Sequence, residues 1–136
     1  MEFETKVAIV VADDLEIWQK LNVVSFLTSG IVGQYPDIIG ENYVDQSDNK
    51  YWPLSIQPAI VLKSSREKLQ TILLRTKSRD IGAALYIEDM FATGHDAANR
   101  ETVRKYPTEE LPVVGIAIRA EKKIVDKVLK GAKLHD

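Results

Sequence analysis

The stretch Lys6-Val-Ala-Ile-Val-Val-Ala12 decides the fold, because it is a short, uninterrupted run of apolar and mostly β-branched residues. Such a run is typical of a strand covered on both faces, as in a sheet between two layers of helices. The Asp13-Asp14 pair then offers oxygens that can cap a following helix. Apolar residues recur at helical spacing from 17 to 31, and Gly30 and Gly33 are expected to end that helix. The start of the chain therefore predicts a strand followed by a helix that packs on the sheet.

Further apolar runs alternate with helical patterns along the rest of the chain. Predicted strands lie at 59–62, 82–87 and 112–118, and predicted helices at 64–76, 96–104 and 121–130. Ser64-Ser65-Arg66-Glu67 fits a capping box, and Asp96 is a candidate cap for the third helix. This alternation predicts one layered α/β domain over residues 1–136, built on a mixed four-stranded sheet.

The segment 40–54 has a different pattern. Two aromatic or β-branched pairs, Tyr43-Val44 and Tyr51-Trp52, flank turn-forming residues at 45–49. This arrangement predicts a small hairpin-like excursion between the first helix and the second strand. Its aromatic side chains could stack on a base or ring, but aromatics in a hairpin more often pack on their own domain, and packing is the expectation here.

The composition excludes several classes of protein. There is no cysteine, which rules out disulfides, thiolate metal sites and a cysteine nucleophile, and a cytoplasmic setting fits best. The longest uncharged stretch, 21–36, is too polar to span a membrane, and Glu2 and Glu4 do not fit the start of a signal peptide. The formal net charge of −2 gives the whole molecule no general attraction for nucleic acid.

Two segments suit contacts with partners. Six basic residues against two acidic ones at 119–133 leave four net positive charges, with Lys127 among them. A solvated helix face is the expectation for this segment, and a surface for phosphates is the alternative. Trp18 lies opposite the most regular apolar positions of the first helix, so it is expected to be partly exposed and suited to an interface such as that of a homodimer.

The segment Glu88-Asp89-Met90-Phe91-Ala92-Thr93-Gly94-His95 is the main candidate for an active region. It follows a predicted strand directly, where α/β sheets tend to place ligand crevices. Of two adjacent carboxylates, the less solvated one rises in pKa and can act as a base. Thr93 adds a hydroxyl, His95 an imidazole, and Gly94 permits an unusual backbone angle that could turn N–H groups toward an anion. The alternative is that Thr93 or Asp96 caps the next helix and that His95 is an ordinary surface histidine.

The sequence offers no motif for a metal or cofactor. The only other histidine is His135, and no pair of histidines has the spacing of metal ligands. Glycine-rich nucleotide-binding loops and the serine-hydrolase elbow are also missing. Asp14 and Lys20 remain as polar residues that follow the first strand, where they either face the crevice or serve as a cap and a solvated side chain.

Several stretches together resemble, in order, landmarks of the type II peptidyl-tRNA hydrolases. They are Val10 to Leu15, Gln57 to Lys63, Ile87-Glu88-Asp89 with Thr93, Val114-Gly115-Ile116, and Val125 to Val128 with Lys133-Leu134. The chain resembles more closely a bacterial family of unknown function in the same superfamily. This closer resemblance lies at Trp18 to Asn22, Met90 to His95 and Val125 to Val128. The resemblance covers nearly the whole chain.

The resemblance implies an α/β/α sandwich around a mixed four-stranded sheet, and often a dimer. The hydrolases use an Asp with a Thr four residues later, and Asp89 and Thr93 keep that spacing. Their first-helix lysine matches Lys20 only across a one-residue gap. Gln19 and Val24 stand where the hydrolases have Gly before that lysine and Gln after it, so the face that would contact substrate differs.

Two functions follow as hypotheses. In the first, Asp89 activates water toward an ester such as that of peptidyl-tRNA, Thr93 binds the water or the oxyanion, and Lys20 stabilises negative charge. In the second, His95 and the hairpin line a pocket for a different small ligand, and the protein binds or regulates without catalysis. The candidate substrate contacts are Asp14, Glu88, Gly94, Trp52 and Lys127.

Overall fold

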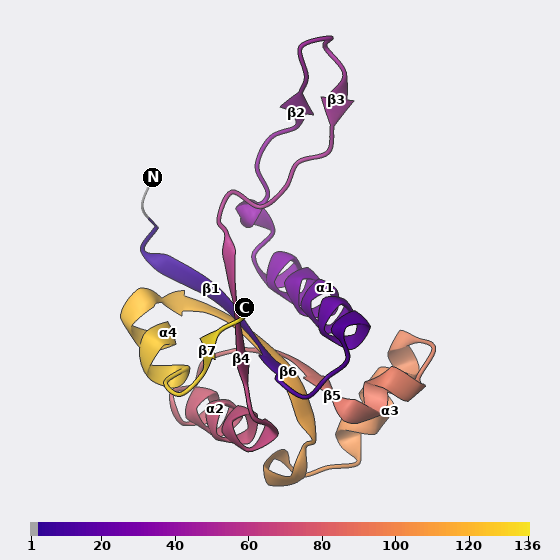
Figure 1. Ribbon diagram of the computed structural model, residues 1–136, viewed down its shortest axis with the longest axis vertical. Helices are drawn as coiled ribbons and strands as arrows, with labels where there is room; N and C mark the ends of the chain where they lie inside the picture. Colours follow the sequence, from indigo (N-terminus) through magenta and orange to yellow (C-terminus); the bar gives the residue numbers. More distant parts are fainter. Residues whose placement is uncertain (1–2) are drawn as a thin grey trace.

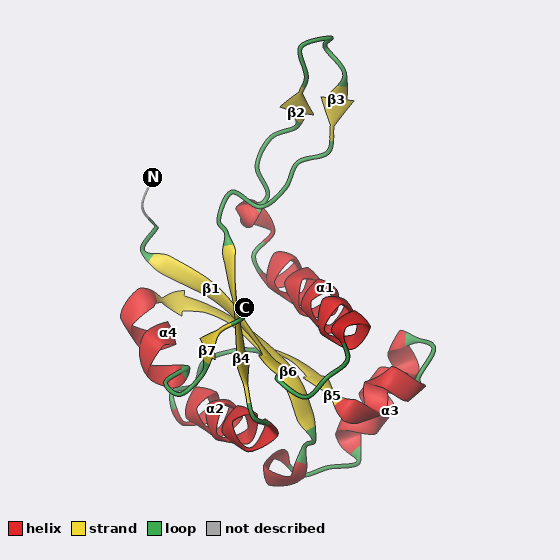
Figure 2. Cartoon of the chain, viewed as in Figure 1, coloured by secondary structure: helices red, strands yellow, loops and turns green. Residues whose placement is uncertain are grey.

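The computed structural model describes residues 3–136, which form a mixed α/β structure with helices on both faces of a sheet (Figure 1, Figure 2). In chain order the elements are β1 Thr5–Ala12, α1 Ile17–Gln34, η1 Pro36–Ile38, β2 Tyr43–Val44, β3 Lys50–Tyr51, β4 Ala59–Ser64, α2 Arg66–Ser78, β5 Ala84–Ile87, η2 Glu88–Ala92, α3 Asp96–Arg104, η3 Thr108–Glu110, β6 Val113–Glu121, α4 Lys122–Val128 and β7 Lys133–Leu134.

The main sheet has five strands in the order β5-β6-β1-β4-β7. β1 and β4 are parallel, and β6 runs antiparallel to both β1 and β5, so β1, β4 and β5 point the same way. The predicted count of four strands is wrong, because Lys133 and Leu134 add a short strand against Lys63 and Leu62. Two residues are too few to show an alternating pattern in a sequence.

Helix α1 lies on one side of the sheet, and α2 and α4 lie on the other (Figure 1). The close fit of α1 requires Gly115 of β6, because a Cβ there would lie 2.4 Å from Cγ1 of Val23 and 3.0 Å from Cδ1 of Leu27. The prediction that Gly30 ends the helix is wrong, since α1 continues to Gln34, one residue beyond Gly33. A Cβ on Gly30 would lie 2.9 Å from that of Ala84, so this glycine serves the contact of α1 with β5.

The helix starts follow the capping rules at positions that were only partly predicted. Ser65 accepts the N–H of Lys68 and caps α2, one residue later than the expected capping box of Ser64 with Glu67 would place the cap. The Asp13-Asp14 pair does not cap α1; Glu16 does, through a reciprocal capping box with Gln19. The residue that caps α1, Glu16, therefore comes later in the chain than the predicted caps, Asp13 and Asp14.

The predicted hairpin is present, but its expected packing on the domain is wrong. Residues 40–56, here called the arm, project from the end of the molecule at which α1 ends (Figure 1). Asp45 holds the turn by accepting the N–H groups of Ser47 and Asn49, and Tyr51 Oη donates to its other oxygen at 2.8 Å. Trp52 is 89% exposed, so its ring meets solvent rather than the core.

Between Phe3 and the end of the chain, none of the helices has both the length and the apolar character needed to cross a membrane.

Candidate functional site

A groove between α1 and α3, floored by β5 and η2, is the main concave surface near the predicted active region. It consists of two adjoining hollows of about 480 and 430 Å³. Both are lined by Phe26, Tyr86, Met90, Asp96 and Asn99. The first extends toward Leu85, Val103 and Arg104, and the second toward Trp18, Asn22, Phe91, Thr93, Gly94 and His95. We call the two together the α1–α3 groove; their sizes match those of small-molecule sites.

Four aromatic rings form one wall of the α1–α3 groove. The ring centroids of Trp18 and Phe91 are 6.0 Å apart, those of Phe91 and Tyr86 5.1 Å, and those of Tyr86 and Phe26 5.7 Å. The contacts are edge-on or tilted, which aromatic pairs prefer to direct face-to-face stacking. Trp18 is 57% exposed, as the sequence predicted, and burial raises the pKa of the Tyr86 phenol.

His95 caps α3 with its ring, because Nδ1 accepts the backbone N–H of Ala98 at 3.2 Å. Neither Thr93 nor Asp96 holds the cap position, so that part of the alternative is wrong, whereas His95 is exposed, as the alternative expected. A ring that accepts on Nδ1 carries its hydrogen on Nε2, which leaves an N–H donor on the side chain that lines the groove. Gly94 has no positive φ, so its expected unusual backbone angle is also wrong. A Cβ there would meet nothing within 4 Å.

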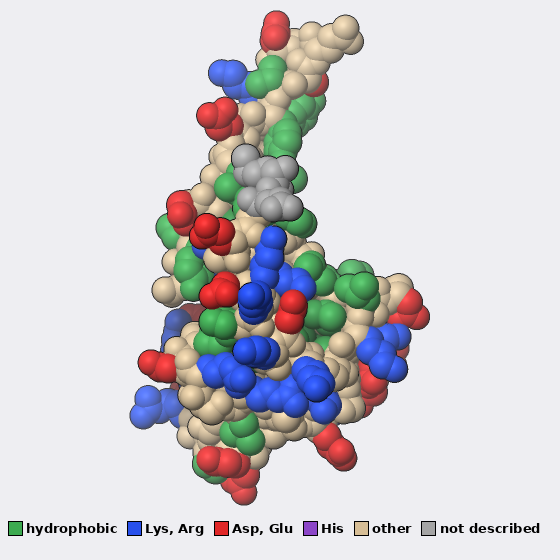
Figure 3. Space-filling model, turned by 90° about the vertical axis from the view of Figure 1, so that its left-hand side faces the viewer, with side chains coloured by type: hydrophobic (Ala, Val, Ile, Leu, Met, Phe, Trp, Pro, Cys, Tyr) green, Lys and Arg blue, Asp and Glu red, His purple; other side chains and the backbone are tan. Residues whose placement is uncertain are grey.

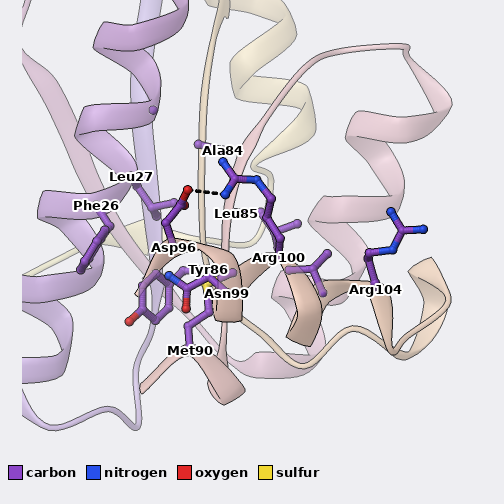
Figure 4. A pocket seen from close by; sticks show the side chains of 12 residues that line it. Phe26, Leu27, Ala84, Leu85, Tyr86, Met90, Asp96, Asn99, Arg100 and Arg104 are labelled. Atoms are coloured by element: carbon purple, nitrogen blue, oxygen red, sulfur yellow. Dashed lines mark hydrogen bonds and ion pairs between the residues drawn. The ribbon is translucent and has the colours of Figure 1, made fainter. Parts of the chain in front are cut away.

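Further polar groups line the floor and the far end of the α1–α3 groove. The single hydroxyl hydrogen of Thr93 is shared between the carbonyl oxygen of Met90, at 3.0 Å, and Oδ1 of Asn99. Arg100 forms an ion pair with Asp96 one turn earlier, as the dashed line in Figure 4 marks. Arg104 lies at the end of α3, and among residues 3–136 no carboxylate forms an ion pair with it.

Asp89 and Glu88 leave the end of β5 in different directions. Asp89 Oδ2 accepts from the phenol of Tyr106 at 2.8 Å, and this hydrogen bond raises the pKa of Tyr106. Glu88 instead forms an ion pair with Arg66 at 2.9 Å, and the Nε of Arg66 lies 3.0 Å from Asp14. Arg66 thus joins the ends of β1 and β5, which the sequence could not show to be neighbours. Asp89 and Thr93 have separate partners, and only Thr93 lines the α1–α3 groove.

Three predicted site residues lie away from the α1–α3 groove. Lys20 is on the opposite flank of α1 from Asn22, and its Nζ is 3.1 Å from Nε2 of His135 beside β7. Trp52 is in the arm. Lys127 belongs to α4 on the other face of the sheet, where Lys and Arg side chains gather below the arm (Figure 3). These three residues do not share a cavity with Asp89 and Thr93.

In the part of the chain that the structure describes, no three His, Asp or Glu side chains come together in an arrangement that could hold a metal ion.

Residues 5–136 match a family described as "Protein of unknown function (DUF2000)". The chain belongs to the DUF2000 family. It is also similar to the solved structure of a protein of unknown function from Agrobacterium tumefaciens, with 55% sequence identity over 99% of this chain and 100% of that one and a TM-score of 0.97. No curated protein matches the chain.

Sequence reasoning found one half of the groove of this DUF2000 protein. It selected Thr93, Gly94 and His95 because polar residues after a strand stand out locally. It missed Phe26, Tyr86 and Asn99, which come from three separate elements. Phe26 carried one signal, since a large apolar residue off the buried face of an amphipathic helix indicates a contact other than the core.

Proposed function

We propose that this DUF2000 protein binds a small amphipathic molecule in the α1–α3 groove, with the apolar or aromatic part of the ligand against the rings and an acidic group toward α3. The observation that carries the proposal is the continuous wall of four aromatic rings that faces convergent polar side chains. Sites for small molecules combine such apolar walls with a few placed donors.

The aromatic wall supports a flat, apolar ligand body. Trp18 and Phe26 are both more than half exposed, although each already contacts a ring of the wall. Covering such rings releases water and is worth about 1.5–3 kcal/mol for each large apolar side chain that becomes fully buried. Covering the exposed half of two such rings therefore contributes about 1.5–3 kcal/mol, which together with burial of the ligand's own ring supports affinity in the millimolar range.

The polar groups support an acidic ligand. His95 presents Nε2–H at one end of the α1–α3 groove, and Asn22 adds an amide on α1. Arg104 and Arg100 line the other end, and Arg100 is held by Asp96 through an exposed ion pair. Exposed pairs of this kind are worth about 1 kcal/mol or less. A ligand carboxylate can therefore replace Asp96 as the partner of Arg100 at little cost.

Phenylacetate and phenylacetamide provide a matched test, because they share a ring and differ in charge. The chain has two tryptophans, so a Trp52→Phe background leaves Trp18 as the only indole reporter. We expect phenylacetate to change the Trp18 emission and to raise the melting temperature more than phenylacetamide does. Asn22→Ala should weaken binding by about fivefold, the loss of one hydrogen bond of about 1 kcal/mol, and Asn42→Ala in the arm is the matched control. Absence of any response to both probes would overturn the proposal.

Ester hydrolysis of the peptidyl-tRNA hydrolase type is a second candidate. It is supported by the Asp89 and Thr93 spacing, and by the phenol of Tyr106, which fixes the orientation of the Asp89 carboxylate. Lys20 would have to leave His135 to act there. The test is release of peptide from an N-acylated aminoacyl-tRNA, with Asp89→Asn expected to abolish turnover and Lys127→Ala to weaken tRNA binding. Turnover no faster than a blank would reject this candidate.

A further inference from the structure

The arm has an unusual surface for a segment in water. Half of the large apolar side chains that are exposed in residues 3–136 belong to it: Tyr43, Val44, Tyr51, Trp52, Leu54 and Ile56. Each of the six is more than half exposed. Tyr43 and Tyr51 are paired and share one face of the hairpin, and Val44 and Trp52 lie on the other. Single exposed apolar residues are ordinary, but a group of this size on one short segment marks an interaction surface.

The arm also lacks a sheet to support it. β2 and β3 pair only with each other, in two residue pairs, and form a sheet of their own. A two-stranded hairpin with no third strand and no covering helix is marginally stable in water. The arm therefore gains order as well as apolar burial when another surface covers it.

A second exposed apolar surface lies on the same chain, on the flank of α1 away from the α1–α3 groove. Ile17 and Leu21, one turn apart on α1, are 77% and 65% exposed. Lys20 lies beside them and reaches His135. Because residues four apart share a helix face, these three side chains form one strip. We call this strip, with the adjoining surface of β4 and β7, the α1 flank.

The adjoining part of the sheet is not covered by α1. Gly115 faces α1, and the pairings Gly115 with Val11 and Val11 with Lys63 place the Lys63 side chain on that same side. Lys133 is opposite Lys63 in β7 and points the same way. The α1 flank thus combines exposed apolar residues with three lysines, one of which, Lys63, forms an ion pair with Asp136.

We propose that the arm of one copy docks on the α1 flank of a second copy, and that two such contacts, related by a two-fold axis, hold a homodimer. The charges are complementary, since the arm carries Glu41, Asp45 and Asp48 against Lys50, whereas the α1 flank carries Lys20, Lys63 and Lys133 against Asp136. One chain holds both halves of the contact, so a two-fold pair covers both at once. This dimer goes beyond the proposed ligand binding and leaves the α1–α3 groove open.

The available area is large enough for a stable dimer. A large aromatic or aliphatic side chain that is at least half exposed offers roughly 100 Å², so the six offer roughly 600 Å² over both faces of the arm and roughly 300 Å² on the face that carries Val44 and Trp52. Two such faces and the two flanks that receive them reach about 1,200 Å² in total, which is the lower end of the range for a stable specific interface. Trp52, the most exposed of the six, is the expected centre of each contact.

Sedimentation equilibrium of the full chain tests the proposal. The wild type should have twice the chain mass of 15.3 kDa at micromolar concentration. Trp52→Ala in the arm and Leu21→Glu in the α1 flank should each weaken the dimer at least about tenfold, the loss of 1.4 kcal/mol or more. Leu74→Glu, on the exposed side of α2, is the control and should leave the dimer intact.

Mixing the two weakened variants identifies the arrangement. An intact arm from the Leu21→Glu chain and an intact flank from the Trp52→Ala chain restore one of the two contacts, so the mixture should contain more dimer than either variant alone. Far-UV circular dichroism of each variant checks that the fold is kept. A wild type that stays monomeric at high micromolar concentration, or a dimer that Trp52→Ala leaves unchanged, would overturn the proposal.

Discussion

The ring of His95 accepts the N–H of Ala98 on Nδ1, at 3.2 Å, and the same ring lines the α1–α3 groove. One side chain thus caps α3 and offers an Nε2–H donor to a ligand. The two roles use different nitrogens, so they can be separated by substitution.

Substituting His95 should separate stability from binding. His95→Ala removes the cap of α3 and should cost about 1 kcal/mol of unfolding free energy, whereas asparagine is itself a good cap, so His95→Asn should cost less. Both variants lose the Nε2–H donor and should bind phenylacetate more weakly. Urea denaturation gives the stability and Trp18 emission gives the affinity; equal stability of the two variants would contradict the capping role.

The titration of Tyr106 should report its hydrogen bond to Asp89. The bond raises the pKa of Tyr106 above its ordinary value of 10.0, so its contribution to stability is present below pH 10.0 and is lost as the pH rises through the folded-state value. Asp89→Asn should move the Tyr106 titration back toward 10.0, as measured by ultraviolet absorbance against a Tyr106→Phe reference. An unchanged titration curve would mean that the phenol has another partner.

The ion pairs by which Arg66 joins the ends of β1 and β5 should contribute little to the unfolding free energy. Arg66, Asp14 and Glu88 have side chains that are 41%, 56% and 46% exposed, and surface pairs contribute about 1 kcal/mol or less. We expect Arg66→Met to lower the unfolding free energy by about that amount, and the loss to shrink in 1 M salt because screening weakens the pairs. A loss that does not change with salt would show that packing of the arginine stem is responsible.

Two glycine substitutions should have opposite effects. Gly115→Ala places a methyl group 2.4 Å from Val23, and overpacking of this kind costs about 1–3 kcal/mol. Gly33→Ala lies within α1 with nothing within 4 Å of the new methyl, and should gain about 0.5–1 kcal/mol from helix propensity. Urea denaturation of both variants measures the difference; a neutral Gly115→Ala would mean that α1 can shift away from the sheet.

The sequence was sufficient where a local pattern carries the information. The apolar run of β1 and the spacing of Leu69, Ile72 and Leu73 predicted a buried strand and a buried helix face, and all three side chains are at most 2% exposed. The match to the DUF2000 family agrees with the predicted resemblance to a bacterial family of unknown function, and the mixed α/β fold is as predicted, whereas the resemblance to the peptidyl-tRNA hydrolases stays a prediction.

It was insufficient where distant segments meet. Gly30 was predicted to end the helix, yet it lies inside α1, where Ala84, far along the chain, leaves no room for a side chain. The α1–α3 groove combines Phe26 with Asn99, and no periodicity connects two such positions. Trp52 is exposed because the arm does not pack against the rest of the domain. The hydrophobicity of a residue does not show whether such a contact is made.

The two-residue strand β7 has a consequence for solubility. β4 would otherwise form a bare edge of the main sheet, and unpaired backbone at such an edge invites strands from other molecules. Lys133 and Leu134 occupy part of that edge, and the Lys133 charge opposes the approach of a foreign strand. A chain shortened before Lys133 should keep its fold but precipitate more readily, because the exposed edges of sheets in different molecules would pair with each other.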